Sequence, residues 1–235
     1  MLQIQTIKPD CLALLKELMG IDELKSFRLA GGTALSLILG HRISIDLDLF
    51  TNQRFEVDEF STFLKIYFED RIKIQGNNRY GVFASIDDIK VDFLYLYEKF
   101  INEENIVQNI RLASTEDIAA MKISAAANRS SKKDYHDLYE LLNVYTFAQI
   151  MEFYVKLYTN YGVASLLRTL SDFDKVNESE EEPLSLTKVS WQTVENRVTH
   201  EVRSYIHTLK QERNNTEAQK HETIKKLIDR RKNKN

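Results

Sequence analysis

Two aspartates, Asp46 and Asp48, flank one leucine in the otherwise apolar residues 45–50. Side chains two positions apart on a strand point to one face, so both carboxylates would meet there. Asp92 interrupts a second, largely apolar run, residues 89–96, and becomes a third candidate ligand if that run forms an adjacent strand. Buried carboxylates need a compensating cation, and their oxygens suit hard divalent ions. The three aspartates therefore predict a site for Mg²⁺ or Mn²⁺, of the kind that activates an attacking oxygen in phosphoryl chemistry.

A glycine pair upstream of the aspartates is suited to binding phosphate. Gly31 and Gly32 stand between a strand-like and a helix-like segment, where a bare backbone and a helix N-terminus can approach an anion. Thr33 adds a hydroxyl, and Arg42 and Ser44 follow before the aspartates. We interpret this glycine-rich stretch, with the hydroxyls and the arginine that follow it, as a phosphate-binding site.

A second set of charged residues lies in a helix-like segment of the other half of the chain, at Lys122, Arg129, Lys133, Asp134 and Asp137. The lysines offer point charges for phosphates, and the arginine can bind two oxygens at once. The two aspartates are three positions apart on one helical face, so one of them could orient a lysine or act as a base. Taken by itself, this set would equally fit an exposed helical face with weak ion pairs.

Both sets resemble motifs of one known family. The segment GGTALSLILGHRISIDLDLF is similar to the first motif of polymerase β-type nucleotidyltransferases, specifically the AbiEii/AbiGii toxin family. The segment KISAAANRSSKKDYHDL matches that family's helical pattern KxxxxxxRxxxKDxxD at every specified position. The resemblance covers about residues 25 to 145. One departure is Gly-Gly-Thr where the family most often has Gly-Ser.

The resemblance assigns roles to these residues. It implies that Gly31, Gly32 and Thr33 hold a nucleoside triphosphate (NTP), that Asp46 and Asp48 bind the divalent metal ions, and that Lys122 and Asp134 take part in catalysis. The further residues expected to contact the nucleotide are Arg42, Ser44, Arg129, Lys133 and Asp137. Asp92 is assigned as the third carboxylate only because it lies in a second strand-like segment. The implied enzyme is an Mg²⁺-dependent nucleotidyltransferase that moves a nucleoside monophosphate from NTP to an acceptor.

The expected acceptor is a tRNA or other RNA 3′ end. The implied setting is a bacterial toxin–antitoxin or phage-defence system, with a cognate antitoxin as a possible protein partner. Two alternatives remain. A non-catalytic nucleotide- or partner-binding module would carry the same residues. A phosphatase of the Asp-x-Asp type ranks lower, because Leu49 and Phe50 replace the Gly-Thr that its chemistry normally requires.

The elements that would position these residues alternate in the first half of the chain. Apolar periodicity predicts helices over residues 9–20, 32–39 and 57–69, and strands over 26–30, 45–50, 72–74, 80–86 and 89–96. The second half is predicted to be helical, with helix starts capped by Ser114 and Thr146 and one long amphipathic helix from Trp191. No strand is expected after about residue 100.

The fold class expected from this pattern is α+β. We predict a nucleotidyltransferase domain over residues 1–110, with a mixed sheet flanked by helices, and a helical bundle domain over residues 111–235 that ends in a basic tail. From residue 201 onward, ten Lys and Arg stand against five Asp and Glu. The tail is either a site for phosphates or a solvated helical face.

Composition limits the class of protein. Apolar residues make up 43% of the chain and charged residues 29%, which is typical of a globular protein. The single cysteine, Cys11, excludes an internal disulfide and favours a reducing compartment, so we expect a cytoplasmic protein. No apolar run approaches the length of a membrane span, and no signal peptide is recognised.

Overall fold

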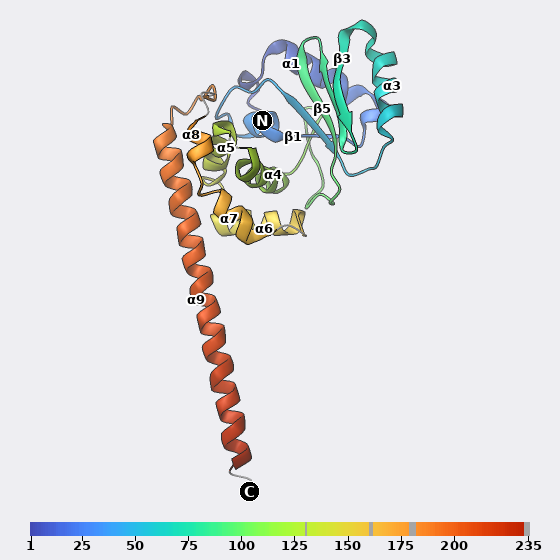
Figure 1. Cartoon of the computed structure of the whole chain (residues 1–235). Helices are drawn as coiled ribbons and strands as arrows, with labels where there is room; N and C mark the ends of the chain where they lie inside the picture. Colours follow the sequence, from blue (N-terminus) through green and yellow to red (C-terminus); the bar gives the residue numbers. More distant parts are fainter. Residues whose placement is uncertain (130, 160–161, 179–181, 233–235) are drawn as a thin grey trace.

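The computed structural model describes residues 1–129, 131–159, 162–178 and 182–232. A mixed sheet lies at one end of the molecule, helices pack beside it, and a long C-terminal helix extends away from both (Figure 1). The described helices are α1 (Pro9–Gly20), α2 (Gly31–Leu39), α3 (Val57–Phe68), α4 (Thr115–Arg129), α5 (Lys132–Leu141), α6 (Phe147–Leu157), α7 (Val163–Thr169), α8 (Asp174–Asn177) and α9 (Trp191–Lys232).

The sheet has the strand order β3-β4-β5-β2-β1-β7-β6. Its strands are β1 (Arg28–Ala30), β2 (Leu47–Thr51), β3 (Ile72–Asn78), β4 (Gly81–Ile86), β5 (Ile89–Tyr95), β6 (Asn105–Val107) and β7 (Ile110–Leu112). Strand β2 pairs antiparallel with β1 and parallel with β5. The α+β fold class predicted from the sequence is confirmed.

Local sequence signals explain where several elements begin and end. Pro9 occupies the first turn of α1, where its missing N–H costs no hydrogen bond. Helix α2 ends at Gly40, which adopts the left-handed conformation that glycine tolerates. The Thr146 side chain accepts from the backbone N–H of Gln149, and the Gln149 side chain accepts in return from the Thr146 N–H, a complete capping box for α6. At α4, the Asp117 N–H donates to the Ser114 hydroxyl, so both predicted caps are confirmed.

The expectation of no strand after about residue 100 is wrong. Strands β6 and β7 form a hairpin whose turn residues, Gln108 and Asn109, both have positive φ, and β7 pairs parallel with β1. A two-residue turn of this kind is a common hairpin connection. The two strands are only three residues long, too short to display an alternating pattern, which is why the sequence did not reveal them.

Strand β7 spans residue 110, so the sheet continues across the predicted domain boundary. One hydrophobic core also includes residues from both parts, from Leu14 in α1 to Val202 in α9. Since the sheet and the core both include residues from either side of residue 110, they do not mark a boundary there. The division into domains over residues 1–110 and 111–235 stays a prediction.

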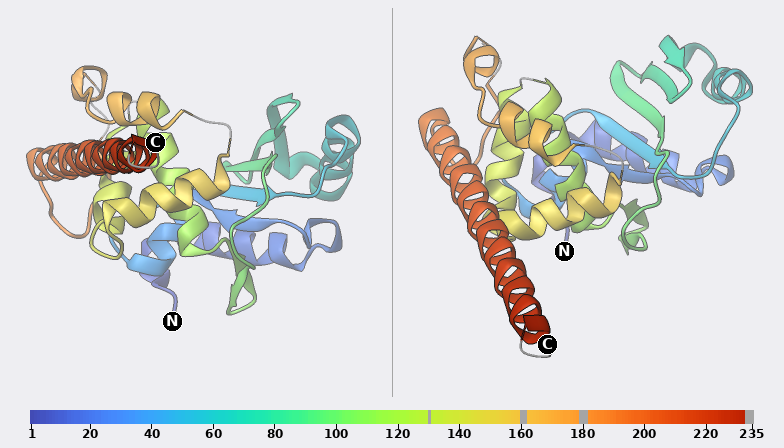
Figure 2. Two further views of the ribbon diagram at one scale, coloured as in Figure 1. Left: turned by 90° about the horizontal axis from the view of Figure 1, so that it is seen from below. Right: turned by 60° about the horizontal axis from the view of Figure 1, so that its bottom comes forward.

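Helices cover the two sides of the sheet differently. Helix α3 lies on one side, and helices α4 to α7 gather on the other (Figure 2). The first part of α9 packs against this helical group through Val194, Val198 and Val202, which are fully buried, as its predicted amphipathic pattern requires. Beyond Leu209, the described side chains of α9 are exposed. Among the described helices, none combines the length and the apolar character that crossing a membrane requires.

Candidate active site

Asp48 and Asp92 are direct neighbours on the two central strands, since the parallel register of β2 and β5 pairs them. The Asp92 side chain is buried, and its Oδ2 lies 2.9 Å from Lys90 Nζ. Its Oδ1 is also buried but has no hydrogen-bond partner. A buried carboxylate oxygen without a partner is costly, so this atom is suited to a cation or a proton donor.

The environment of Asp48 disfavours its charge. Burial raises the pKa of Asp48, and the nearby Asp92 raises it further, whereas Lys122 and Lys90 act in the opposite direction. Two carboxylates held side by side repel each other unless a positive charge lies between them or beside them. Asp46 immediately precedes β2 and is partly exposed.

Gly31 and Gly32 have no side chains, and this leaves room for the side chains of Asp48 and Arg42, which come close to their backbone. Gly31 has a φ of +66°, and a Cβ built on it would lie 2.1 Å from Asp48 Oδ2. A Cβ on Gly32 would lie 2.0 Å from Arg42 Nη2. Both contacts are far shorter than van der Waals distance, so neither position accepts a side chain without displacing Asp48 or Arg42.

The two hydroxyls predicted to contact phosphate are buried and face each other. Thr33 Oγ1 lies 2.9 Å from Ser44 Oγ and also hydrogen-bonds to the Asp46 carbonyl. Thr33 thereby connects the first turn of α2 to the segment that precedes β2. This geometry makes Thr33 a positioning residue for Asp46, whereas Ser44 lines the pocket described below.

Asp137 is the centre of a buried ion-pair network. Its side chain is fully buried and accepts from Arg42 through both oxygens, at 2.6 Å from Nε and 2.9 Å from Nη2. Lys122 Nζ lies 2.7 Å from Asp137 Oδ2, and His41 Nε2 lies 2.7 Å from Oδ1. Although burial opposes ionisation, Lys122 and Arg42 hold the pKa of Asp137 well below its ordinary value. The network joins α5 to α4 and to the loop after α2.

Lys122 also binds the second acid of the helical motif, with its Nζ 2.9 Å from Asp134 Oδ1. Burial lowers the pKa of this lysine, but Asp137 and Asp134 outweigh that effect and raise it. Lys122 is therefore a cation held by two carboxylates, and its charge also acts on Asp48 across the site.

A pocket of about 370 Å³ brings the two motifs together. The predicted residues that line it are Gly32, Arg42, Ser44, Asp46, Asp48, Lys122, Arg129, Lys133 and Asp134. The remaining predicted residues, Gly31, Thr33, Asp92 and Asp137, do not line it and contact residues that do.

Several residues in or beside the pocket were not among those predicted from the sequence. Lys90 has the same strand parity as Asp92, a signal visible in the sequence, but it was not included among the predicted site residues. Glu182 and Leu184 belong to a segment remote in sequence, which reaches the pocket because Leu184 O accepts from the Ile43 N–H at 2.9 Å. His41 precedes Arg42, and only the fold reveals its contact with Asp137.

Asp46, Asp48 and Asp92 are the candidate ligands of a metal ion in this site. In the part of the chain that the structure describes, no group of three or more His, Cys, Asp or Glu side chains converges as a complete metal site. The adjacent pair Asp48 and Asp92 nevertheless fits a divalent cation, because one buried oxygen lacks a partner and the two carboxylates are side by side.

Comparison with known proteins agrees with the geometry. The profile of the family described as "Nucleotidyl transferase AbiEii toxin, Type IV TA system" matches residues 13–215. The uncharacterized protein aq_aa25 of Aquifex aeolicus (strain VF5) is 31% identical over 196 residues, which are 82% of this chain and 94% of that protein. The crystal structure of JHP933 from Helicobacter pylori superimposes with a TM-score of 0.53 at 19% identity, over 90% of this chain and 98% of that one, and shows the same fold. The chain therefore belongs to the AbiEii family of nucleotidyltransferase toxins and is a nucleotidyltransferase.

Proposed function

We propose that the chain transfers a nucleoside monophosphate from NTP to the 3′ hydroxyl of an RNA, releasing pyrophosphate, and that the reaction depends on Mg²⁺ or Mn²⁺. The observation that carries this proposal is the single pocket lined by Asp46 and Asp48 on one side and by Lys122, Arg129 and Lys133 on the other. Carboxylates for a metal and cations for a triphosphate are the two requirements of nucleotidyl transfer.

In this proposal Asp48 and Asp92 hold the divalent ion, and Asp46 contributes from the pocket wall. When bound, the ion neutralises phosphate charge and lowers the pKa of the attacking hydroxyl. The chain's own contribution is to fix the two carboxylates side by side on β2 and β5 and to leave one Asp92 oxygen without a protein partner.

The triphosphate is proposed to bind between the start of α2 and the helical motif. Gly32 lies in the first turn of α2, where backbone N–H groups and the helix dipole favour an anion. Arg129 and Lys133 line the opposite wall, and Lys122 adds a buried positive charge. Because Asp134 already binds Lys122, we assign Asp134 the role of orienting this lysine rather than that of a base.

The biological setting is part of the same proposal. An RNA acceptor, such as the 3′ end of a tRNA, and a cognate antitoxin are the partners expected for a toxin of this family, and the reaction is expected to take place in the cytoplasm. The helical part of the chain, proposed as a second domain, supplies half of the residues that line the pocket, four of them from α4 and α5.

The experiment that tests the proposal incubates the protein with each labelled NTP, total RNA and Mg²⁺, and follows label in RNA. Asp48→Asn is expected to abolish the transfer, whereas the exposed Asp88→Asn, whose partner is Lys73 on the sheet edge, serves as the matched control. Transfer by Asp48→Asn at the wild-type rate would refute the proposed site. If the affinity for NTP were the same with and without Mg²⁺, and no label were transferred to RNA, the result would favour a non-catalytic nucleotide-binding module.

A further inference from the structure

A second hollow opens beside the active-site pocket, between the sheet and α4. Its volume is about 360 Å³, and it shares Arg129 with the active site. Farther from the acids it shares Tyr80 and Tyr95 with a third hollow of about 910 Å³, which lies at the ends of β3 and β5. These shared side chains connect the three hollows into one path. We call its two outer parts the tyrosine groove.

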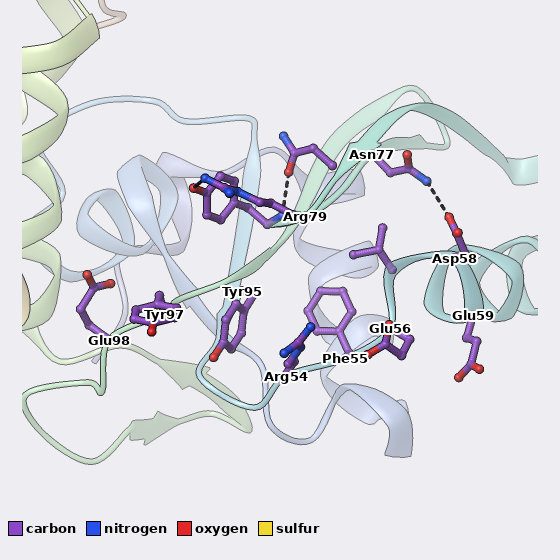
Figure 3. Close-up of a pocket in the computed structure, with 13 residues that line it drawn as sticks. Arg54, Phe55, Glu56, Asp58, Glu59, Asn77, Arg79, Tyr95, Tyr97 and Glu98 are labelled. Carbon is purple, nitrogen blue, oxygen red and sulfur yellow. Dashed lines mark hydrogen bonds between the residues drawn. The ribbon is translucent and has the colours of Figure 1, made fainter.

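Exposed aromatic rings follow this path. Tyr80 is 46% exposed and Tyr97 is 78% exposed, both unusually high for side chains of this size. The Tyr95 and Tyr97 rings meet edge to face with centroids 6.4 Å apart, and the Arg79 guanidinium lies 4.7 Å from the centroid of Tyr80. Figure 3 shows Tyr95 and Tyr97 side by side along one wall, with Arg79 on the other. Open aromatic faces beside arginines are suited to stacking with flat, unpaired bases.

The position of the tyrosine groove relative to Asp48 and Asp92 also supports a single strand with unpaired bases as its ligand. Leu94 lies two residues beyond Asp92 on β5, which places it on the same face of the strand and about 7 Å farther along it. Leu94 lines the second hollow together with Tyr80 and Tyr95. An RNA whose terminal hydroxyl reaches the acids therefore has its preceding nucleotides beside Tyr95 and Tyr80. Arg129, at the junction of the pocket and the groove, is placed for a phosphate between the two.

The charge of the groove indicates bases rather than a duplex backbone. Arg54 and Arg79 line its outer part together with four acids, Glu56, Asp58, Glu59 and Glu98. A wall with two cations and four acids has a net negative charge and repels phosphates, so the bases of a bound strand would face it. Asn77 and Asn78 add amide groups to the same wall, and Figure 3 shows Glu59 pointing away from the tyrosines. Amides and carboxylates can pair with the edges of bases that are free of a partner strand.

We propose that the tyrosine groove binds the unpaired nucleotides that precede the reacting 3′ end of the RNA acceptor, with Tyr80, Tyr95 and Tyr97 as stacking surfaces. This inference rests on the proposed function, because it places the acceptor strand at the same site. It predicts that the enzyme selects RNAs with a single-stranded 3′ overhang over blunt duplexes.

The test measures the affinity for a fluorescently labelled single-stranded RNA of mixed sequence by anisotropy. The double variant Tyr80→Ala/Tyr97→Ala should weaken binding at least about thirtyfold, since removing each stacked ring is expected to lower single-strand affinity several-fold or more. The control is Tyr67→Ala, a similarly exposed tyrosine on α3 outside the groove, which should bind as the wild type does. Tyr80→Phe/Tyr97→Phe keeps both rings and should restore the affinity.

Two readouts separate this inference from the proposed function. RNA binding needs no turnover, whereas Mg²⁺-dependent NTP binding, followed by calorimetry on the same wild-type sample, tests the catalytic pocket alone. Equal RNA affinity in the double alanine variant and in Tyr67→Ala would overturn the inference and leave the groove to a protein partner. So would equal wild-type affinity for the labelled strand and for its blunt duplex.

Discussion

Replacing Asp137 by asparagine tests whether this residue holds the active site together or binds the nucleotide itself. The fully buried Asp137 carboxylate neutralises Arg42 and Lys122, which are each only 6% exposed. In the variant, Lys122 keeps Asp134, whereas Arg42 keeps the carbonyl of Ile43 and a neutral amide oxygen but loses the carboxylate it binds in the wild type. Breaking a buried pair by removing one partner typically costs ~3–5 kcal/mol. For a chain of this size, that loss should lower the unfolding midpoint by roughly 6–20 °C.

The same substitution should change the response to acid. Lys122 and Arg42 overcome the opposing effect of burial and depress the pKa of Asp137 in the folded protein. A carboxyl with a depressed pKa contributes stability above its unfolded pKa, about 3.9, and this stability is lost as the pH falls through the folded pKa. The difference in unfolding free energy between wild type and Asp137→Asn should therefore be complete at neutral pH and shrink below about pH 4.

Thermal and urea unfolding, followed by circular dichroism across this pH range, measures both effects. The control is Asp87→Asn, whose carboxylate pairs with Arg71 at the surface and should leave the midpoint almost unchanged. An Asp137→Asn protein that unfolds at the wild-type temperature but binds NTP more weakly would refute the reasoning, because Asp137 would then act on the nucleotide.

Three further substitutions test other contacts. Gly31→Ala should abolish transfer, and it should lower the free energy of unfolding by ~1–2 kcal/mol because residue 31 has a left-handed backbone conformation. The control is Gly20→Ala, whose added methyl group would meet no atom within 4 Å. Transfer and unfolding assays should show no change for this control. Asp48→Asn should abolish labelled transfer without lowering the unfolding midpoint, because it removes a charge that burial and Asp92 disfavour. Glu182→Gln removes a negative charge from the pocket wall, so the KM for NTP should fall a few-fold at low salt and less at high salt; an unchanged KM would contradict this.

The sequence was sufficient to predict the parts of the site that depend on local periodicity. Asp46 and Asp48 were both predicted to lie on a strand over residues 45–50, and Asp92 on a second strand, because alternation over six to eight residues is visible in one sequence. The structure places Asp48 on β2 and Asp92 on β5, whereas Asp46 lies immediately before β2. The register that places Asp48 beside Asp92 could not be derived, since it depends on how distant strands pair.

Contacts between distant segments explain what the sequence could not provide. Strand β7 pairs with β1, and the segment that contains Glu182 is hydrogen-bonded to the loop at Ile43. Each pair of segments is separated by more than 80 residues. No sequence pattern in either segment indicates which partner it contacts. For the same reason Arg42 and Asp137 were both predicted to bind the nucleotide, although they bind each other. Each motif contains half of this ion pair, so the first motif cannot hold its shape around Gly32 unless the second is in place. The two motifs depend on each other for their structure. A substitution at Arg42 or at Asp137 should therefore alter the geometry of both motifs.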